Sequence, residues 1–322
     1  MPGWTRVRHG RGFRYLDEQG APLAAIDIER CKKLVIPPAW KEVWICPIEN
    51  GHLQAVGTDE SGRRQYLYHP AWREHRDRQK FQAMEDFADA LVRRRPVVRR
   101  HLSTDDLGLR HAQATAFALL DLGVFRIGSD RYTEEYGSFG LTTVLRDHVR
   151  RRREGIVFTY TGKSGQEVNV TVSDSRITGA VEPMLRRRTG GDQLLAWRDR
   201  AGWHPVAPED VNAYIKEVLQ GDFTAKDFRT WRGTVIAALA LAHGDARTKT
   251  ARKRAVTAAM REVAEHLGNT PAVARSSYVD PRVVDLFEHG ITVSAEHRMP
   301  EPGQSVAPSL EREVLGILDA GP

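Results

Sequence analysis

The stretch HLQAVGTDESGRRQYLYH, residues 52–69, decides how this chain is divided. Two runs of alternating apolar and polar residues flank a Gly, Asp and Ser turn, which is the pattern of a β-hairpin. Alternation along the second run places Tyr66 and Tyr68 on one face, with Arg64 beside them. From about residue 80 the apolar residues recur at helical spacing instead, as Phe81, Met84, Phe87, Ala88, Leu91 and Val92. The period therefore changes near residues 72–80, where we place the join between two domains.

The residues before this hairpin also favour β structure. VWICPI, at 43–48, is a short apolar strand. The adjacent prolines of VIPPAW, at 35–40, predict a loop, because proline cannot donate to a strand ladder. We predict a small β-rich domain at residues 1–76.

Helical periodicity dominates the remainder, residues 77–322. The predicted helices are LRHAQATAFALLDLG (109–123), PEDVNAYIKEVLQG (208–221), FRTWRGTVIAALALAHG (228–244), RKRAVTAAMREVAEHLG (252–268) and a short terminal SLEREVLGILDA (309–320). GIVFTYTGKSGQEVNVTV, at 155–172, breaks this pattern and predicts a β-hairpin with Lys163 at its tip. The predicted fold class is α+β, with a small β-rich N-terminal domain before a larger, mainly α-helical domain that contains a β-hairpin.

The charge balance is basic, with 48 Lys and Arg against 42 Asp and Glu and a net charge of +6. The arginines cluster at 93–101, 146–154 and 185–191. Guanidinium donates in a fork that fits phosphate oxygens, so such clusters favour a nucleic-acid partner. The alternative is a set of solvated helix faces.

Several classes of protein are disfavoured by composition. No apolar run approaches the length that spans a bilayer, and the basic N-terminus lacks the apolar core of a signal peptide, so we expect a cytoplasmic protein with no membrane partner. Cys31 and Cys46 make neither a disulfide framework nor a zinc cluster, and we expect reduced thiols. No His, Cys and carboxylate group has metal-ligand spacing. The Gly-Lys-Ser of 162–164 is not a nucleotide-binding loop, because Val157 stands where that loop needs glycine.

Four stretches carry residues suited to transesterification at a phosphodiester. A tyrosine hydroxyl can attack phosphorus, and two arginines can neutralise the charge that grows on the non-bridging oxygens. A lysine on a hairpin can protonate the departing oxygen, and a side-chain amide can add one hydrogen bond. Taken singly, each such residue is more often surface or core than catalytic. The stretches are 124–144 with Arg126, 161–165 with Lys163, 223–231 with Arg229, and 265–281 with Asn269 and Tyr278.

Together and in this order, the four stretches resemble those of the type IB DNA topoisomerases, in their small poxvirus-like bacterial branch. The resemblance covers about residues 25–290 and includes IPPAWKEVWICPIENGHLQAVGTDESGRRQYLYHPAWREHR, similar to the family's DNA-clamp domain. FRIGSDRY and KDFRTW resemble the motifs of the two catalytic arginines, which implies those roles for Arg126 and Arg229. TGKSG resembles the general-acid hairpin, which implies Lys163, and SSY after GNTPAVAR implies Tyr278 as the nucleophile.

The resemblance implies a monomer that clamps duplex DNA and relaxes supercoils without ATP, metal or other cofactor. Tyr278 would form a 3′-phosphotyrosine, the cut strand would swivel, and the free 5′-hydroxyl would religate it. The implied DNA contacts are Arg63, Gln65, Tyr66, Tyr68, Arg76, Arg131 and Tyr132. For the two hairpin tyrosines, packing within the hairpin is the competing interpretation.

One position departs from the family pattern. Most members have histidine nine residues before the tyrosine, and this chain has Asn269. Asparagine still donates a hydrogen bond but carries no charge, which could cost roughly 1–3 kcal/mol of transition-state stabilisation. Two alternatives stay open: a tyrosine recombinase, disfavoured by Lys226-Asp227-Phe228-Arg229 in place of His-x-x-Arg and by the β-rich N-terminal part, and a DNA-binding member that has lost cleavage.

Overall fold

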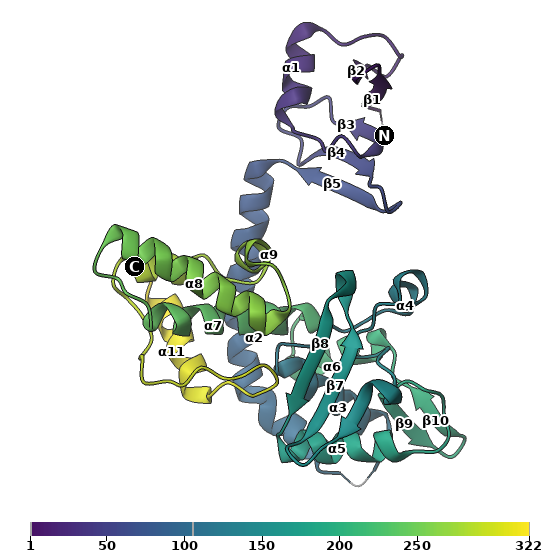
Figure 1. Ribbon diagram of the computed structural model, residues 1–322, viewed down its shortest axis with the longest axis vertical. Helices are drawn as coiled ribbons and strands as arrows, with labels where there is room; N and C mark the ends of the chain where they lie inside the picture. The colour runs from purple at the N-terminus through teal and green to yellow at the C-terminus, as the bar shows by residue number, and fades with distance from the viewer. Residues whose placement is uncertain (1, 105, 322) are drawn as a thin grey trace. The chain divides into compact units, whose positions relative to one another are not determined.

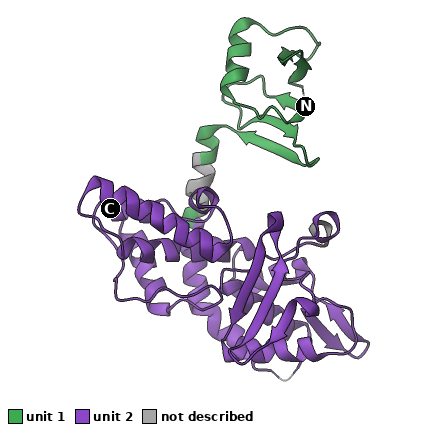
Figure 2. Ribbon diagram, in the orientation of Figure 1, with its two compact units in different colours: residues 1–82 green, residues 83–322 purple. Residues whose placement is uncertain are grey.

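The computed structural model describes residues 2–104 and 106–321, except for the side chains of residues 74–80 and 130–132. It divides into two compact units, residues 1–82 and residues 83–322 (Figure 2). Strands dominate the first unit and helices the second, which confirms the α+β class. The division falls inside one long helix, α2 (Pro70–Leu102), and so does the join predicted between residues 76 and 77.

The first unit is an antiparallel sheet with strand order β2-β1-β3-β4-β5 (Figure 1). Its elements are β1 (Trp4–His9), β2 (Gly12–Leu16), α1 (Ala25–Lys33), β3 (Lys41–Ile45), β4 (Leu53–Thr58) and β5 (Arg64–Tyr68). The predicted hairpin of 52–69 is confirmed as β4 and β5. Its small core joins Cys31 of α1 to Val43 and Ile45 of β3. Residues 35–40 form a loop, as predicted. Buried Arg6 of β1 donates to the carbonyls of Ile36, Pro37 and Trp40 and so fixes this loop to the sheet.

The second unit packs its helices around one apolar core. They are α3 (Leu109–Asp121), α4 (Asp130–Tyr136), α5 (Ser175–Arg186), α6 (Pro208–Leu219), α7 (Ala225–Ala242), α8 (Lys249–Leu267), α9 (Pro271–Ser277), α10 (Arg282–Glu288) and α11 (Pro308–Ala320). The predicted helical faces are buried as expected: Val211, Tyr214, Ile215, Val218 and Leu219 on α6, and Val256, Met260, Val263 and Leu267 on α8. None of the described helices is both long and apolar enough to cross a membrane.

The hairpin with Lys163 at its tip is confirmed as β7 (Ile156–Thr161) and β8 (Glu167–Val172). A short strand, β6 (Val149–Arg151), pairs with β7, so β6 and β8 form the two edges of this sheet. A second hairpin, β9 (Ala196–Asp199) and β10 (Gly202–Pro205), stands apart from it. The sequence did not predict β6 or this hairpin, because runs of three or four residues carry too little periodicity.

Helix α7 is the centre of the second unit, and it contacts α3, α6, α8, α10 and α11. Nearly every side chain from Phe228 to Leu239 is buried. A Cβ atom at Gly233 would lie 2.5 Å from the carbonyl oxygen of Tyr278 and 3.1 Å from its Cβ. Glycine at this position therefore lets the backbone of Tyr278 rest directly on α7, four residues along the helix from Arg229.

Candidate active site

Tyr278 ends helix α9 and lies half-buried against the core. Its backbone N–H donates to Ala274 at 3.0 Å, which closes the last turn of α9. Two residues later, fully buried Asp280 donates its backbone N–H to the hydroxyl of Thr234 on α7 at 3.0 Å. The carboxylate of Asp280 in turn pairs with Arg282. The tyrosine is thus fixed by backbone contacts on both sides, and its hydroxyl is left available for chemistry.

Arg229 lies under this tyrosine, with its guanidinium carbon 5.0 Å from the centre of the Tyr278 ring. The side chain is buried and donates to the carbonyls of Gly123 and Val124 at 3.1 and 3.0 Å, and to Leu267 at 2.6 Å. Burial first, and then the charge of Arg126, lower the pKa of Arg229 to about 10. Its buried Nε has no hydrogen-bond partner among the described residues.

Arg126 and Asn269 meet beside Arg229, although 143 positions separate them in the chain. Arg126 donates to the side-chain oxygen of Asn269 at 2.7 Å and to the carbonyl of Gly268 at 3.1 Å. The other end of the Asn269 amide, Nδ2, is buried and has no partner among the described residues. A buried amide N–H without an acceptor is uncommon and costly, so this donor is suited to an anionic ligand.

Lys163 occupies the exposed tip of the β7–β8 hairpin, in a short 3-10 turn. Two backbone hydrogen bonds define the position of the tip: Gly162 donates to Gln166 at 2.7 Å, and Phe139 donates to Thr161 at 2.9 Å. The second bond ties the hairpin to the loop that carries Arg126, since Leu141, two residues after Phe139, donates to the carbonyl of Arg126 at 2.7 Å.

The electrostatics of the site make the Tyr278 hydroxyl easier to ionise. Burial raises the pKa of Tyr278, but the charge and hydrogen bonding of Arg229, with the charges of Arg126 and Lys163, outweigh it and lower the pKa below its usual value. All three cations that the sequence nominated therefore act on this one hydroxyl. The structure brings the candidate residues Arg126, Lys163, Arg229, Asn269 and Tyr278 together.

Tyr160, on β7, is a member of this cluster that the sequence analysis missed. Its side chain is buried, and burial raises the pKa of Tyr160 to about 12 against the opposing charges of Arg126 and Arg229. The signal was present in the strand alternation, which turns Ile156, Phe158 and Tyr160 inward. Tyr160, three residues before Lys163, is therefore a polar side chain on an inward position of β7, next to Arg126 and Arg229.

The predicted DNA contacts of the first unit separate into two faces. Tyr66 and Tyr68 lie on one exposed face, as predicted, with their rings stacked at 6.3 Å. Gln65 is half-buried on the other face and donates to Asp59 at 2.8 Å, and Arg63 pairs with the same carboxylate at 3.1 Å. The remaining predicted contacts, Arg76, Arg131 and Tyr132, have side chains outside the described residues.

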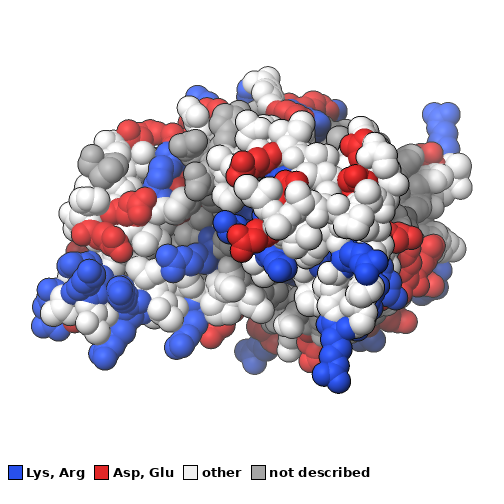
Figure 3. Space-filling model, turned by 90° about the horizontal axis from the view of Figure 1, so that it is seen from above, with Lys and Arg blue, Asp and Glu red and all other residues white. Residues whose placement is uncertain are grey.

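Part of the arginine clustering is structural. Arg187 is buried and donates to the carbonyls of Met184 and Leu194, and Arg146 donates to the carbonyl of Arg187. Arg95 pairs with Asp121 and Glu311 inside the second unit. On the surface, acidic side chains lie among the basic ones over the face seen in Figure 3. The clusters at 93–101, 146–154 and 185–191 therefore supply internal ties as well as surface charge.

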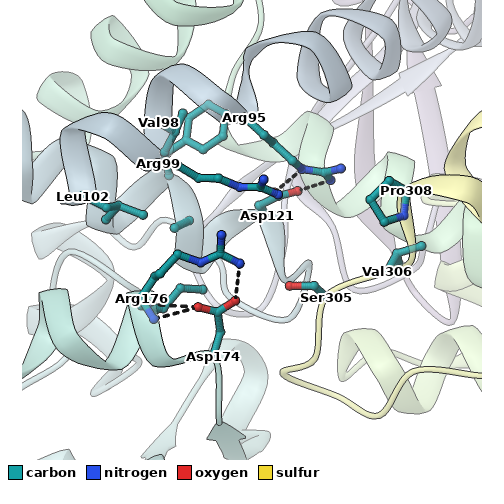
Figure 4. Close-up of a pocket in the computed structure, with 13 residues that line it drawn as sticks. Arg95, Val98, Arg99, Leu102, Asp121, Asp174, Arg176, Ser305, Val306 and Pro308 are labelled. Atoms are coloured by element: carbon teal, nitrogen blue, oxygen red, sulfur yellow. Dashed lines mark hydrogen bonds and ion pairs between the residues drawn. The ribbon is translucent and has the colours of Figure 1, made fainter.

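Cys31 and Cys46 are both free and buried. Among the described residues, no group of three His, Cys, Asp or Glu side chains is placed to hold a metal ion. A pocket of about 250 Å³ lies between α2, α3 and the start of α5 (Figure 4). Its described lining residues include none of the five candidate catalytic residues.

Tyr278 lies over Arg229, and Arg126 and the Lys163 hairpin lie near enough for their charges to act on its hydroxyl. Residues 69–294 match the family model described as eukaryotic DNA topoisomerase I, catalytic core, and residues 12–59 match the one described as bacterial DNA topoisomerase IB, N-terminal domain. The chain belongs to the type IB DNA topoisomerase family. All five candidate catalytic residues lie inside the first match, whereas residues 1–11, 60–68 and 295–322 lie in neither.

Two viral relatives are similar over much of their length. A DNA topoisomerase 1B of Acanthamoeba polyphaga mimivirus is 27% identical over 330 residues, which cover 98% of this chain and 97% of the relative. A DNA topoisomerase 1 of Rabbit fibroma virus (strain Kasza) is 25% identical over 245 residues, covering 73% and 72%. The alignment with the first relative includes both units of the chain.

Proposed function

We propose that this enzyme relaxes supercoiled duplex DNA by cutting and rejoining one strand through Tyr278. The Tyr278 oxygen attacks a backbone phosphorus, and its own proton goes to solvent. The bond from phosphorus to the 5′-oxygen breaks, Lys163 donates a proton to that oxygen, and a 3′-phosphotyrosine remains. After the cut strand has rotated, Lys163 takes the proton of the 5′-hydroxyl and the 5′-oxygen attacks the phosphorus of the phosphotyrosine. The bond from phosphorus to the Tyr278 oxygen breaks, the phenolate regains a proton from solvent, and the original phosphodiester is restored. No net hydrolysis occurs, so the cycle consumes no ATP.

The observation that carries this proposal is the lowered pKa of Tyr278 among three converging cations. A lowered pKa makes the phenolate a better-populated nucleophile at neutral pH and a better leaving group on religation. The partnerless Nε of Arg229 and Nδ2 of Asn269 supply donors for the non-bridging oxygens. Charge neutralisation by arginine serves the purpose that a divalent cation serves in other phosphoryl-transfer sites.

The roles of duplex DNA and of the first unit belong to the same proposal. We propose that the exposed tyrosines of β5 lie against the DNA, with Arg64 on the same face. Contacts from these side chains to the DNA phosphates would hold the duplex in register while Tyr278 reacts. We also propose that the enzyme acts as a monomer, because the five candidate catalytic residues come from a single chain.

Relaxation of a negatively supercoiled plasmid, without ATP and with EDTA, tests the proposal. The wild type relaxes the plasmid, and Tyr278→Phe binds the duplex but leaves it supercoiled. A denaturing gel of the wild-type reaction should show protein attached to the 3′ end of the cut strand. Binding without relaxation by both proteins would favour a DNA-binding member that has lost cleavage, and exchange of strands between two duplexes would favour a recombinase.

A further inference from the structure

The segment that leads into α11, residues 300–306, runs past three elements of the candidate active site. It is the yellow loop of Figure 1, and it lies outside the catalytic-core match. Every third residue is buried, at Pro300, Gly303 and Val306, while those between them are exposed. One side of an otherwise irregular segment therefore packs against the rest of the second unit.

The first contact is with the end of α8. His266 is buried, and its Nε2 lies 2.6 Å from the carbonyl oxygen of Pro300. Its Nδ1 lies 2.9 Å from the carbonyl oxygen of Glu262 in the preceding turn. The next two residues, Leu267 and Gly268, present the carbonyls that hold Arg229 and Arg126. His266 thus ties the segment to the helix end on which both arginines rest.

The second contact is with the lysine hairpin. A Cβ atom at Gly303 would lie 2.5 Å from the carbonyl oxygen of Thr171 and 2.6 Å from a methyl carbon of Val170. Both residues belong to β8, an edge strand of the sheet. Gly303 also has a φ of +88°, which favours glycine. The segment covers the base of the hairpin at a distance that only glycine permits.

The third contact is with α7 and the core. Arg232, three residues after Arg229, donates to the carbonyl of Gln304. The chain continues from this segment into α11, where buried Glu311 pairs with Arg95 and accepts from Trp231 of α7 at 3.0 Å. Ser305, Val306 and Pro308 form one wall of the pocket in Figure 4, in which the Arg95–Asp121 pair is also drawn. The far end of the segment is therefore firmly anchored.

We propose that residues 300–306 hold the candidate catalytic residues in position. Two positioning residues make this contact: Gly303 within the segment, and His266 of α8, which binds the segment at Pro300. Gly303 sets the tilt of the β7–β8 hairpin, and with it the place of Lys163. His266 sets the end of α8, and with it Arg126, Arg229 and Asn269. The inference rests on the proposed function, because it assigns Lys163 as the proton donor to the leaving oxygen.

Single-turnover cleavage with two leaving groups separates the two positioning roles. One DNA carries the natural 5′-oxygen at the scissile bond, and the other carries sulfur there. A thiol has a pKa of about 8.5, so a thiolate leaves without the proton that an alkoxide needs. We expect Gly303→Ala to slow cleavage of the oxygen substrate by about 10- to 100-fold and to be largely restored on the sulfur substrate. We expect His266→Leu to slow both substrates equally.

Gly290→Ala is the matched control for Gly303→Ala. Gly290 has a φ of +81°, similar to that of Gly303, but a Cβ atom there would meet nothing within 4 Å. Both variants carry the same kind of backbone strain, and only Gly303→Ala disturbs β8. Equal cleavage rates for the two variants, or an equal loss on both substrates for Gly303→Ala, would overturn the proposal.

Amide hydrogen exchange gives a readout that does not depend on chemistry. Exchange at residues 162–172 should increase in Gly303→Ala and stay at the wild-type level in Gly290→Ala. If the wild type cleaves neither substrate, the proposed function fails, while the exchange data still decide whether the segment holds the hairpin. If Gly303→Ala does not fold, His266→Leu decides by exchange at residues 300–306, where a wild-type pattern would contradict the tie to α8.

Discussion

Asn269 offers the sharpest test of how this site stabilises a phosphate. Its side-chain oxygen accepts from Arg126 at 2.7 Å, while its buried Nδ2 has no partner. A hydrogen bond to a charged group contributes about 1.5–3 kcal/mol, and leaving a buried donor unpaired costs about 1–3 kcal/mol. If Nδ2 binds a non-bridging oxygen only when DNA is present, Asn269→Ala should lower the rate constant of single-turnover cleavage by about 10- to 150-fold.

The same variant should have little effect on folding. It removes the bond to Arg126, but it also removes a buried donor that is unpaired in the free protein, and these effects oppose one another. The thermal midpoint should therefore stay within about 4 °C of the wild type. Asn269→His should keep activity, because histidine also donates. A normal cleavage rate for Asn269→Ala, or an inactive but folded Asn269→His, would refute the assignment.

Further predictions concern the support of Tyr278, its ionisation and the first unit. Gly233→Ala should lower the free energy of unfolding by about 1–3 kcal/mol in a denaturant titration, because its Cβ would lie 2.5 Å from the Tyr278 carbonyl oxygen. The control Gly316→Ala, whose Cβ would meet nothing within 4 Å in α11, should leave that free energy unchanged. Arg126→Ala removes a charge that lowers the pKa of Tyr278, so the pH at which cleavage levels off should move upward; an unchanged profile would exclude that coupling. Tyr66→Ala and Tyr68→Ala should weaken duplex binding without changing the thermal midpoint of unfolding, since both side chains are exposed. If the affinity for duplex DNA is unchanged, the two tyrosines only stack on one another and do not contact DNA.

The sequence predicted the elements with strong periodicity and missed the short ones. Helices α6 and α8 and both long hairpins lie where the apolar pattern placed them. The strand β6 and the hairpin of β9 and β10 escaped, because runs of three or four residues carry too little periodicity to predict a strand. The arginine clusters show the same limit. Nothing local distinguishes Arg187, which is buried against carbonyls, from Arg186, which is exposed and pairs with Glu182.

The residues of the candidate site could be predicted from the sequence, but the contacts that hold them in place could not. Motif resemblance nominated Arg126, Lys163, Arg229 and Tyr278 without a view of what holds them. Tyr160 and the segment of residues 300–306 were missed because their relation to the site exists only in three dimensions. In the sequence, Gly303 belongs to a Pro- and Gly-rich stretch without a distinguishing pattern. Only the structure shows that β8 passes too close for any side chain at this position.

Helix ends explain how two arginines can share one small site. Gly123 follows α3 and Gly268 ends α8, and both have positive φ values that stop a helix and expose its last carbonyls. Leu267, the last residue of α8, and Gly123, just past the end of α3, accept from Arg229, and Gly268, which caps α8, accepts from Arg126. These carbonyls lie at or just beyond the negative ends of the two helix dipoles.

This arrangement offsets the repulsion between the two guanidinium groups only in part, since the charge of Arg126 contributes to the lowered pKa of Arg229. A phosphodiester placed between them would relieve the remaining repulsion. The unbalanced positive charge in the free enzyme is therefore the feature that would make a DNA phosphate the preferred ligand of this site.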